Sequence, residues 1–193
     1  MAALKKEVTS YTYRDYQTWP EDVRVELING VVYNMAAPAQ KHQWLVIELA
    51  GLFNHYLKGK GCRLFIAPAD VRLNQDQGDD TVVQPDLFVV CDPSKLDGQN
   101  CNGAPDLIVE ILSPSTASKD CVLKFNKYLE AGVREYWIIN PEQQHIHVHT
   151  LVNGNYITTP YAQLEDDDRP QVTVGIFSDL VIDLVELFAV MAF

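Results

Sequence analysis

Two acidic residues stand inside strongly apolar runs of this 193-residue chain. Asp86 lies in the run Val-Val-Gln-Pro-Asp-Leu-Phe-Val-Val, and Glu110 lies in Asp-Leu-Ile-Val-Glu-Ile-Leu. Runs of Val, Ile, Leu and Phe without polar alternation are typical of strands with little water around them. A carboxylate in such a strand is costly unless a positive group pairs with it. The two runs therefore favour a covered sheet, and the two acids suggest a bound cation.

The rest of the chain alternates between helical and extended patterns. In the first half we expect a helix at Thr12–Trp19, a hairpin of strands Val23–Ile28 and Val31–Met35, a helix at Gln40–Lys58, a strand at Cys62–Leu73 bent at Pro68, and strands at Val82–Cys91 and Leu107–Leu112. In the second half we expect a helix capped by Thr116 or Ser118 and ending at Ala131, a strand at Arg134–Ile139, a hairpin of strands Ile146–Leu151 and Tyr156–Tyr161, and an amphipathic helix from Ser178. The dipeptides Asn29-Gly30 and Asn153-Gly154 are typical of type I′ hairpin turns.

This order predicts a mixed sheet of the α/β or α+β class, with helices packed against it and extra antiparallel strands. The sequence has no internal repeat and no linker-like stretch, so we expect a single domain over residues 1–193.

The sequence also indicates the cellular compartment that we expect for the protein. No apolar run approaches the ~20 residues that a membrane-spanning helix needs, and no long apolar stretch follows the N-terminal lysines as it does in a signal peptide. The four cysteines (Cys62, Cys91, Cys101 and Cys121) have no C-x-x-C spacing. We therefore interpret them as free thiols of a cytoplasmic protein rather than as a disulfide framework or a zinc site.

Asp86 and Glu110 are the strongest candidates for chemistry. Consecutive strands usually lie close together, so their carboxylates can converge on a hard cation. Mg²⁺ favours one or two carboxylates together with waters and a phosphate oxygen, and it activates water for attack on a phosphoryl group. The alternative is that Asp86 merely starts a strand after a proline, while Glu110 faces solvent on an edge strand.

Two further residues are weaker candidates. Glu26, in Val-Glu-Leu-Ile-Asn-Gly, is either a third acidic ligand or a solvent-facing strand residue. Lys124 lies early in the helix that follows the Glu110 strand, where its ammonium could stabilise developing negative charge. Its alternative is a surface ion pair with Asp120.

Three alternating histidines, His145, His147 and His149, face one side of a predicted strand. Side chains at i and i+2 are ~7 Å apart along a strand, which is too far for all three to share one ion comfortably. We therefore expect an exposed sheet face there rather than a zinc or nickel site.

Several motifs together resemble the Uma-two family, a group of restriction-type endonucleases in the PD-(D/E)XK superfamily. They are Glu-Leu-Ile-Asn-Gly, Pro-Asp-Leu-Phe-Val-Val, Pro-Asp-Leu-Ile-Val-Glu-Ile-Leu-Ser-Pro-Ser-Thr, and the later series Asp120, Lys124, Tyr128 and Gly132-Val-Arg-Glu-Tyr-Trp-Ile-Ile. The resemblance spans roughly residues 10–190 and is most specific from Pro105 to Pro141. It implies a restriction-endonuclease-like core and Mg²⁺-dependent cleavage of DNA phosphodiester bonds, with Mn²⁺ as a substitute.

The resemblance also implies roles for individual residues. Asp86 and Glu110 match the metal carboxylates, the backbone carbonyl of Ile111 matches a further ligand, and Glu26 matches the acidic residue of the first segment. His42 matches a position where the family commonly has histidine and is a candidate substrate contact, as is Lys127.

One position departs from the wider superfamily. The superfamily's lysine usually follows the second acid by two residues, where this chain has Leu112. Lys124 in the next helix is the matching lysine.

The net charge of −11 argues against nucleic acid, because phosphate binding depends on Lys and Arg. Basic residues gather locally in two groups, Lys58, Lys60 and Arg63, and Lys119, Lys124 and Lys127. We therefore expect weak, salt-sensitive binding of DNA, or a homodimer that joins two thin patches. Alternatives are a degenerate nuclease fold that only binds or assembles, and a phosphohydrolase acting on another substrate.

Overall fold

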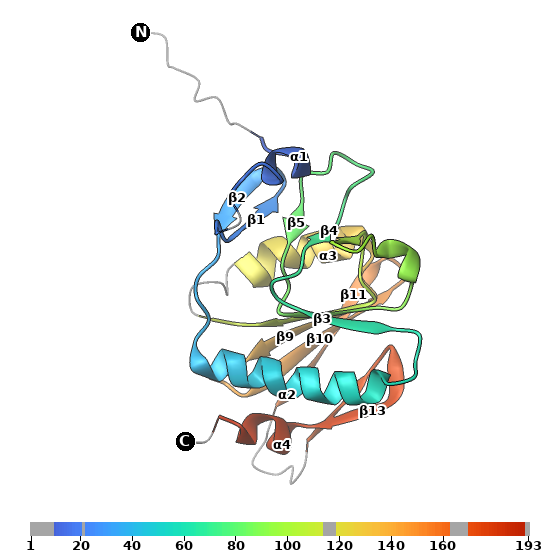
Figure 1. Ribbon diagram of the computed structural model, residues 1–193. Helices are drawn as coiled ribbons and strands as arrows, with labels where there is room; N and C mark the ends of the chain where they lie inside the picture. The colour runs from blue at the N-terminus through green and yellow to red at the C-terminus, as the bar shows by residue number, and fades with distance from the viewer. Residues whose placement is uncertain (1–9, 21, 114–118, 163–169, 192–193) are drawn as a thin grey trace.

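A computed structural model describes residues 10–20, 22–113, 119–162 and 170–191. A central sheet is covered by helix α2 on one side and by helix α3 and a smaller sheet on the other (Figure 1). Helix α4 lies beyond α2, at the opposite end of the molecule from the smaller sheet. This arrangement confirms the predicted mixed sheet with flanking helices.

The central sheet has six strands in the order β11-β10-β9-β8-β6-β3. Its strands are β3 (Arg63–Ile66), β6 (Leu87–Val90), β8 (Leu107–Ile111), β9 (Glu135–Asn140), β10 (His145–Val152) and β11 (Asn155–Ala162). Strands β8 and β9 run parallel, whereas the other neighbours in this sheet are antiparallel. The parallel step requires a crossover, which the segment containing α3 (Phe125–Ala131) provides.

Both faces of this sheet are buried, which explains the unbroken apolar runs. Side chains alternate across a strand, so Leu107, Val109 and Ile111 pack with α2 (Gln40–Leu57) and the C-terminal elements. Ile108 packs on the opposite side with Tyr128 of α3. Glu110 has the same parity as Ile108 and therefore projects toward α3.

The smaller sheet has the strand order β2-β1-β5-β4-β7. Its strands are β1 (Val25–Ile28), β2 (Val31–Asn34), β4 (Val71–Arg72), β5 (Val82–Val83) and β7 (Cys101–Asn102). Helix α1 (Tyr13–Tyr16) and the 3₁₀ turn η1 (Pro93–Lys95) complete the first half. Asn29 and Gly30 both have positive φ, as do Asn153 and Gly154, so both predicted turns are confirmed.

Two predicted strands each divide between the two sheets. The strand expected at Val82–Cys91 is β5 followed by β6, with a break at Gln84-Pro85-Asp86. The strand expected at Cys62–Leu73 is β3 followed by β4, with a cis peptide bond between Ala67 and Pro68. A strand pattern in the sequence does not encode the sheet to which each half is hydrogen-bonded, so neither division was predicted.

The C-terminal helix is shorter than expected. Strands β12 (Gln171–Val174) and β13 (Phe177–Asp183) form a hairpin, and α4 spans only Leu184–Ala189. The Asp183 carboxylate accepts a hydrogen bond from the Glu186 N–H, which caps α4 and fixes its first turn there. Leu184 and Leu187 are buried against the α2 face of the central sheet.

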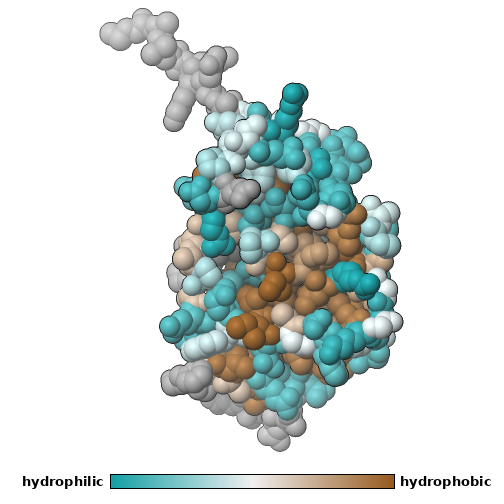
Figure 2. Space-filling view, viewed as in Figure 1, coloured by the Kyte–Doolittle hydropathy of each residue, from teal (hydrophilic) through white to brown (hydrophobic). Residues whose placement is uncertain are grey.

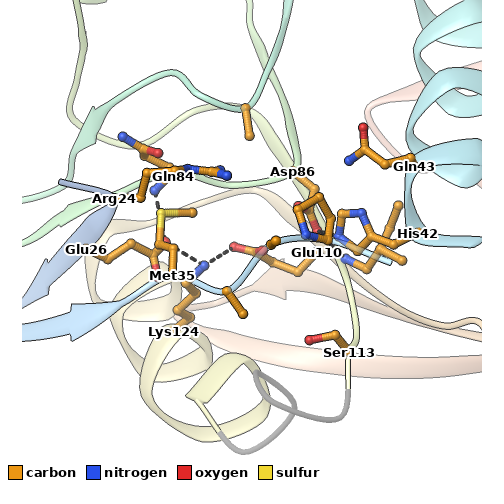
Figure 3. A pocket seen from close by; sticks show the side chains of 15 residues that line it. Arg24, Glu26, Met35, His42, Gln43, Gln84, Asp86, Glu110, Ser113 and Lys124 are labelled. Carbon is orange, nitrogen blue, oxygen red and sulfur yellow. Dashed lines mark hydrogen bonds and ion pairs between the residues drawn. The ribbon is translucent and has the colours of Figure 1, made fainter. Parts of the chain in front are cut away.

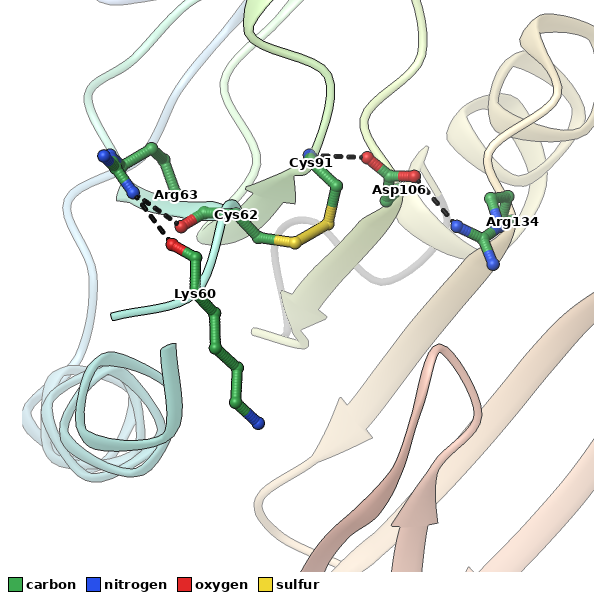
Figure 4. The surroundings of a disulfide bond; sticks show 6 residues. All are labelled: Lys60, Cys62, Arg63, Cys91, Asp106 and Arg134. Carbon is green, nitrogen blue, oxygen red and sulfur yellow. Dashed lines mark hydrogen bonds and ion pairs between the residues drawn. A yellow bond between two sulfur atoms is a disulfide. The ribbon is translucent and has the colours of Figure 1, made fainter. Parts of the chain in front are cut away.

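The interpretation of all four cysteines as free thiols is wrong for two of them. Cys62 and Cys91 form a disulfide, with a Cα–Cα distance of 3.9 Å (Figure 4). The β3–β6 ladder ends with Arg63 paired to Val90, and Cys62 and Cys91 are the next residues beyond that end. Strand pairing therefore places the two cysteines opposite each other. The bond also removes part of the support for a reducing, cytoplasmic setting.

The described residues have no helix long and apolar enough to cross a membrane. Apolar residues are nevertheless exposed at the middle of the face shown in Figure 2, whereas the part of that face that carries β1 and β2 is mainly polar. Ile66, on the edge strand β3, is 47% exposed.

Candidate active site

Glu110 lies on β8, and Asp86 is the residue just before β6, the antiparallel neighbour of β8. The β6–β8 ladder ends with Leu87 paired to Val109, so extending its register by one residue sets Asp86 across from Glu110. Opposed residues of an antiparallel pair project to the same face of the sheet. The strand order alone therefore brings the two predicted carboxylates together on the α3 side.

The Asp86 carboxylate is held through one of its oxygens. Oδ2 accepts a hydrogen bond of 2.7 Å from the Ile111 N–H and lies 3.1 Å from Nε2 of His42. His42 lies in the first turn of α2 and is buried, so the helix start is fixed against the strand edge. The other oxygen of Asp86, Oδ1, takes part in neither of these contacts.

The ammonium of Lys124 lies between Glu26 and Glu110 (Figure 3). Its Nζ is 2.7 Å from Glu26 Oε1 and 2.8 Å from Glu110 Oε1. The three side chains are almost completely buried, with Lys124 only 3% exposed. Lys124 is therefore buried rather than a surface lysine, and Glu110 does not face solvent, whereas the side chain of Asp120 lies outside the described residues. Burial of two carboxylates is tolerable here because a basic side chain within ion-pair distance lies between them.

The helix that follows β8 supplies a second donor to Glu110. Residues Lys119–Lys124 form a π-helix, a wider turn that is frequent at functional sites, and α3 continues from it. Tyr128 lies one turn after Lys124, and its hydroxyl donates to the same Glu110 Oε1 at 2.7 Å. Burial, followed by the nearby Glu110 charge, raises the pKa of Tyr128 well above its usual range, so the phenol stays protonated.

Glu26 belongs to β1 of the smaller sheet and is fully buried. Its Oε1 also accepts a hydrogen bond of 3.0 Å from the backbone N–H of Gln84, in the segment that joins β5 to β6. The expectation of a solvent-facing Glu26 is therefore excluded. Its carboxylate anchors both Lys124 and the segment that leads to Asp86.

A cleft exposes this constellation to solvent. Its walls include Arg24, Glu26, His42, Asp86, Glu110, Ile111 and Lys124. Its lining has three carboxylates beside two basic side chains, Arg24 and Lys124, so acidic groups outnumber basic ones. Carboxylate and carbonyl oxygens are the ligands that Mg²⁺ prefers, and the excess of acidic groups fits a hard divalent cation.

The acidic residues do not form a three-ligand cage. Within the described ranges, no group of three or more His, Cys, Asp or Glu side chains is placed to hold one metal ion. Glu26 and Glu110 are both engaged by Lys124, so the roles of these two acids and of Asp86 as metal ligands stay predictions. The backbone N–H of Ile111 contacts Asp86, and the role of its carbonyl as a ligand stays a prediction.

The structure places other predicted residues away from the cleft. Lys127 forms an ion pair with Glu130 and lines a separate surface pocket. Leu112 packs against the apolar cluster around α3, so its position contributes no charged group. The expected capping residues Thr116 and Ser118 lie outside the described residues.

The histidine strand is only partly an exposed face. His145 and His147 are half-buried, but His149 is buried, and its Nδ1 lies 2.8 Å from the Thr158 hydroxyl. Burial, followed by the charge of His147, lowers the pKa of His149 to about 4.

Three contributors to the cleft received no role from the sequence. Tyr128 had a usable signal, because residues four apart on a helix share a face with each other. The exposed Arg24 and the backbone N–H of Gln84 had none, since both reach the cleft through contacts between distant segments.

Comparison with known proteins shows that the chain has a nuclease-like fold. A solved structure from Anabaena variabilis, described as a putative nuclease belonging to DUF820, matches with a TM-score of 0.75. It covers 94% of this chain and 99% of its own at 22% identity, so it shows a common nuclease-like fold. An uncharacterized protein of Synechocystis sp. is 28% identical over 151 residues, which is 76% of this chain and 78% of the relative.

The family follows from a match over most of the chain. The model of the Uma2 family, described as "Putative restriction endonuclease", matches residues 13–183. The chain therefore belongs to the Uma2 family, which confirms the resemblance found in its motifs.

Proposed function

We propose that the protein is a metal-dependent endonuclease that hydrolyses phosphodiester bonds in DNA. The observation that carries the proposal is the position of Asp86, just before β6, across from Glu110 of the paired strand β8, with the Lys124 ammonium 2.8 Å from Glu110. Membership in the Uma2 family supports nuclease chemistry. Mg²⁺, or Mn²⁺ in its place, would supply an activated water and neutralise charge on the phosphoryl group.

Each residue of the cleft has a distinct part in this proposal. Asp86 and Glu110 hold the cation, and the contacts of Asp86 with His42 and the Ile111 N–H fix the direction of its carboxylate. Lys124 and Tyr128 orient Glu110 from the helix side. The exposed Arg24 at the cleft wall is suited to contact a phosphate, because its guanidinium donates several hydrogen bonds.

The surface charge agrees with weak DNA binding. Lys124 is buried and adds nothing to a basic surface, while Lys41, Lys60 and Arg72 pair with Glu142, Asp179 and Asp79, respectively. Carboxylates therefore offset the charge of these three surface cations. We propose that binding is strongly salt-sensitive and that a homodimer could join two such surfaces.

A catalytically degenerate binding module is the second candidate. The observation that favours it is the burial of Lys124 between two carboxylates, which leaves its ammonium engaged rather than directed at a substrate. A phosphohydrolase acting on a small, non-DNA substrate is the third, because the net charge of −11 disfavours a polyanion.

The test is cleavage of supercoiled plasmid with Mg²⁺ or Mn²⁺. Asp86→Asn and Glu110→Gln should each abolish nicking while the protein remains folded. Glu142→Gln is the matched control, because Glu142 is an exposed carboxylate that pairs with Lys41 and does not line the cleft. Nicking that persists in both cleft variants would reveal a contaminant and refute the proposal. DNA binding without cleavage would support the degenerate module, and hydrolysis of a small phosphodiester with intact plasmid would support the third candidate.

A further inference from the structure

A second group of potential metal ligands lies outside the nuclease cleft. His145, His147 and His149 alternate along β10, and none of them lines the cleft. The ring centroids of His145 and His147 are 4.7 Å apart, and those of His147 and His149 are 6.3 Å apart. The rings of the first pair are therefore closer than the spacing of residues along a strand suggests.

This separation matches two imidazoles that share one ion. With metal–nitrogen bonds of about 2.0–2.1 Å and bond angles of about 90–120°, two such rings have centroids roughly 4.5–5.5 Å apart. The 4.7 Å of His145 and His147 falls inside this range, whereas the 6.3 Å of the second pair falls outside it. The spacing of the first two rings is therefore compatible with one shared ion.

The two rings are also available to an ion. Both side chains are half-buried, and neither ring makes a hydrogen bond or ion pair within the parts of the chain that the structure describes. A bound cation would also find no lysine or arginine on the facing strand positions, where Ala162 and Pro160 pair with the two histidines.

His149 has a different environment. Its Nδ1 contacts the Thr158 hydroxyl, and its ring packs edge-on against Phe125 of α3. The buried Nε2 has no hydrogen-bond partner, so this histidine fills an aromatic pocket as a neutral ring. His149 packs β10 against α3 and is not a candidate ligand beside His145 and His147.

We propose that His145 and His147 chelate one divalent transition-metal ion of the imidazole-preferring class, such as Zn²⁺, Ni²⁺ or Cu²⁺. Within the described residues no third His, Cys, Asp or Glu completes the group, so water would fill the other positions. Imidazole ligands select a different metal class from the oxygen ligands of the cleft. The chain would thus carry two metal sites that do not compete for the same ion.

The test uses Cu²⁺ as the probe, followed by calorimetric titration and pulsed electron paramagnetic resonance on the full chain. The wild type should bind one Cu²⁺ whose spectrum shows coupling to two imidazoles. His145→Gln or His147→Gln should weaken binding by about tenfold or more, and the double variant should lose the imidazole signal. His55→Gln is the matched control, because His55 is an exposed histidine on α2.

Two outcomes would overturn the proposal. One is unchanged Cu²⁺ affinity in the double variant, and the other is a wild-type spectrum with coupling to fewer than two imidazoles. Melting curves of each variant without metal establish that it is folded. The result is independent of nuclease activity, since the readout is metal binding at β10 rather than DNA cleavage.

Discussion

Replacing Lys124 with Met tests whether the buried ion pairs are arranged as described. The substitution keeps most of the side-chain volume but removes the ammonium that lies 2.7 Å from Glu26 and 2.8 Å from Glu110. Glu26 is 0% exposed and Glu110 is 3% exposed, so water from the cleft can solvate the two remaining carboxylates only slightly. Removing one partner from a buried ion pair costs about 3–5 kcal/mol.

Thermal unfolding gives the clearest measurement. For a domain of this size, 1 kcal/mol corresponds to about 2–4 °C, so the melting temperature should fall by roughly 10 °C. Lys127→Met is the matched control, because Lys127 lies one turn away and makes a surface pair with Glu130 worth at most about 1 kcal/mol. A triple variant that also carries Glu26→Gln and Glu110→Gln should recover most of the loss, since no buried charge is then unpaired.

The reasoning would be refuted by a melting temperature of Lys124→Met within about 2 °C of wild type. That result would mean that the ammonium does not lie between the two carboxylates. Failure of the triple variant to recover would instead show that packing of the lysine stem, and not charge, supports this part of the structure.

Three other perturbations have defined outcomes. Tyr128→Phe removes one donor from the Glu110 carboxylate and should lower the free energy of unfolding by about 1–3 kcal/mol in urea titrations; an unchanged midpoint would contradict this hydrogen bond. Reduction of the bond between Cys62 and Cys91, 29 residues apart, should cost about 3–4 kcal/mol by loss of loop closure, and equal melting curves with and without dithiothreitol would argue against the disulfide. The pKa of His149 is about 4 in the folded protein against an ordinary 6.5, so its contribution to the free energy of unfolding is complete above pH 6.5 and is lost as the pH falls toward 4. His149→Gln should therefore flatten the dependence of the free energy of unfolding on pH between 6.5 and 4. The same pH dependence in the variant and the wild type would exclude a neutral buried imidazole.

Local patterns in the sequence predicted the parts of the fold that depend on neighbours in the chain. The stripe that gives α2 and the Asn-Gly turns were recognisable, because spacing and positive φ are properties of short segments. The Cys62–Cys91 bond was missed, because it depends on which strands pair rather than on spacing between the cysteines. The hairpin at Gln171–Asp183 was missed for the same reason.

The candidate site was predictable to the extent that strand order fixes it. Asp86 and Glu110 follow from two adjacent apolar strands, and the family resemblance suggested Lys124 as the third member. The resemblance also named Glu26, but its ion pair with Lys124 depends on how the two sheets are placed, which no local pattern in the sequence provides.

A buried acid in an apolar strand does not by itself mark a cation site. Glu135 is fully buried in β9, and its carboxylate accepts hydrogen bonds from Trp137 Nε1 and from the N–H groups of Gly175 and Ile176. A Cβ at Gly175 would approach Glu135 Oε2 to 2.9 Å, so a glycine there permits the contact. This carboxylate is satisfied by neutral donors, whereas Glu110 has a charged partner and opens onto a cleft.

The link that Lys124 makes between Glu26 and Glu110 has a mechanical consequence. Glu26 belongs to the smaller sheet and Glu110 to the central one, so the ammonium fastens two separately hydrogen-bonded sheets at their seam. Binding of a cation or a phosphate would change the charge of this cleft, and with it the strength of the ion pairs that join the two sheets. The rate of amide hydrogen exchange in β1 and β2 should therefore change when a cation or a phosphate binds in the cleft, although β2 contributes no charged side chain to it.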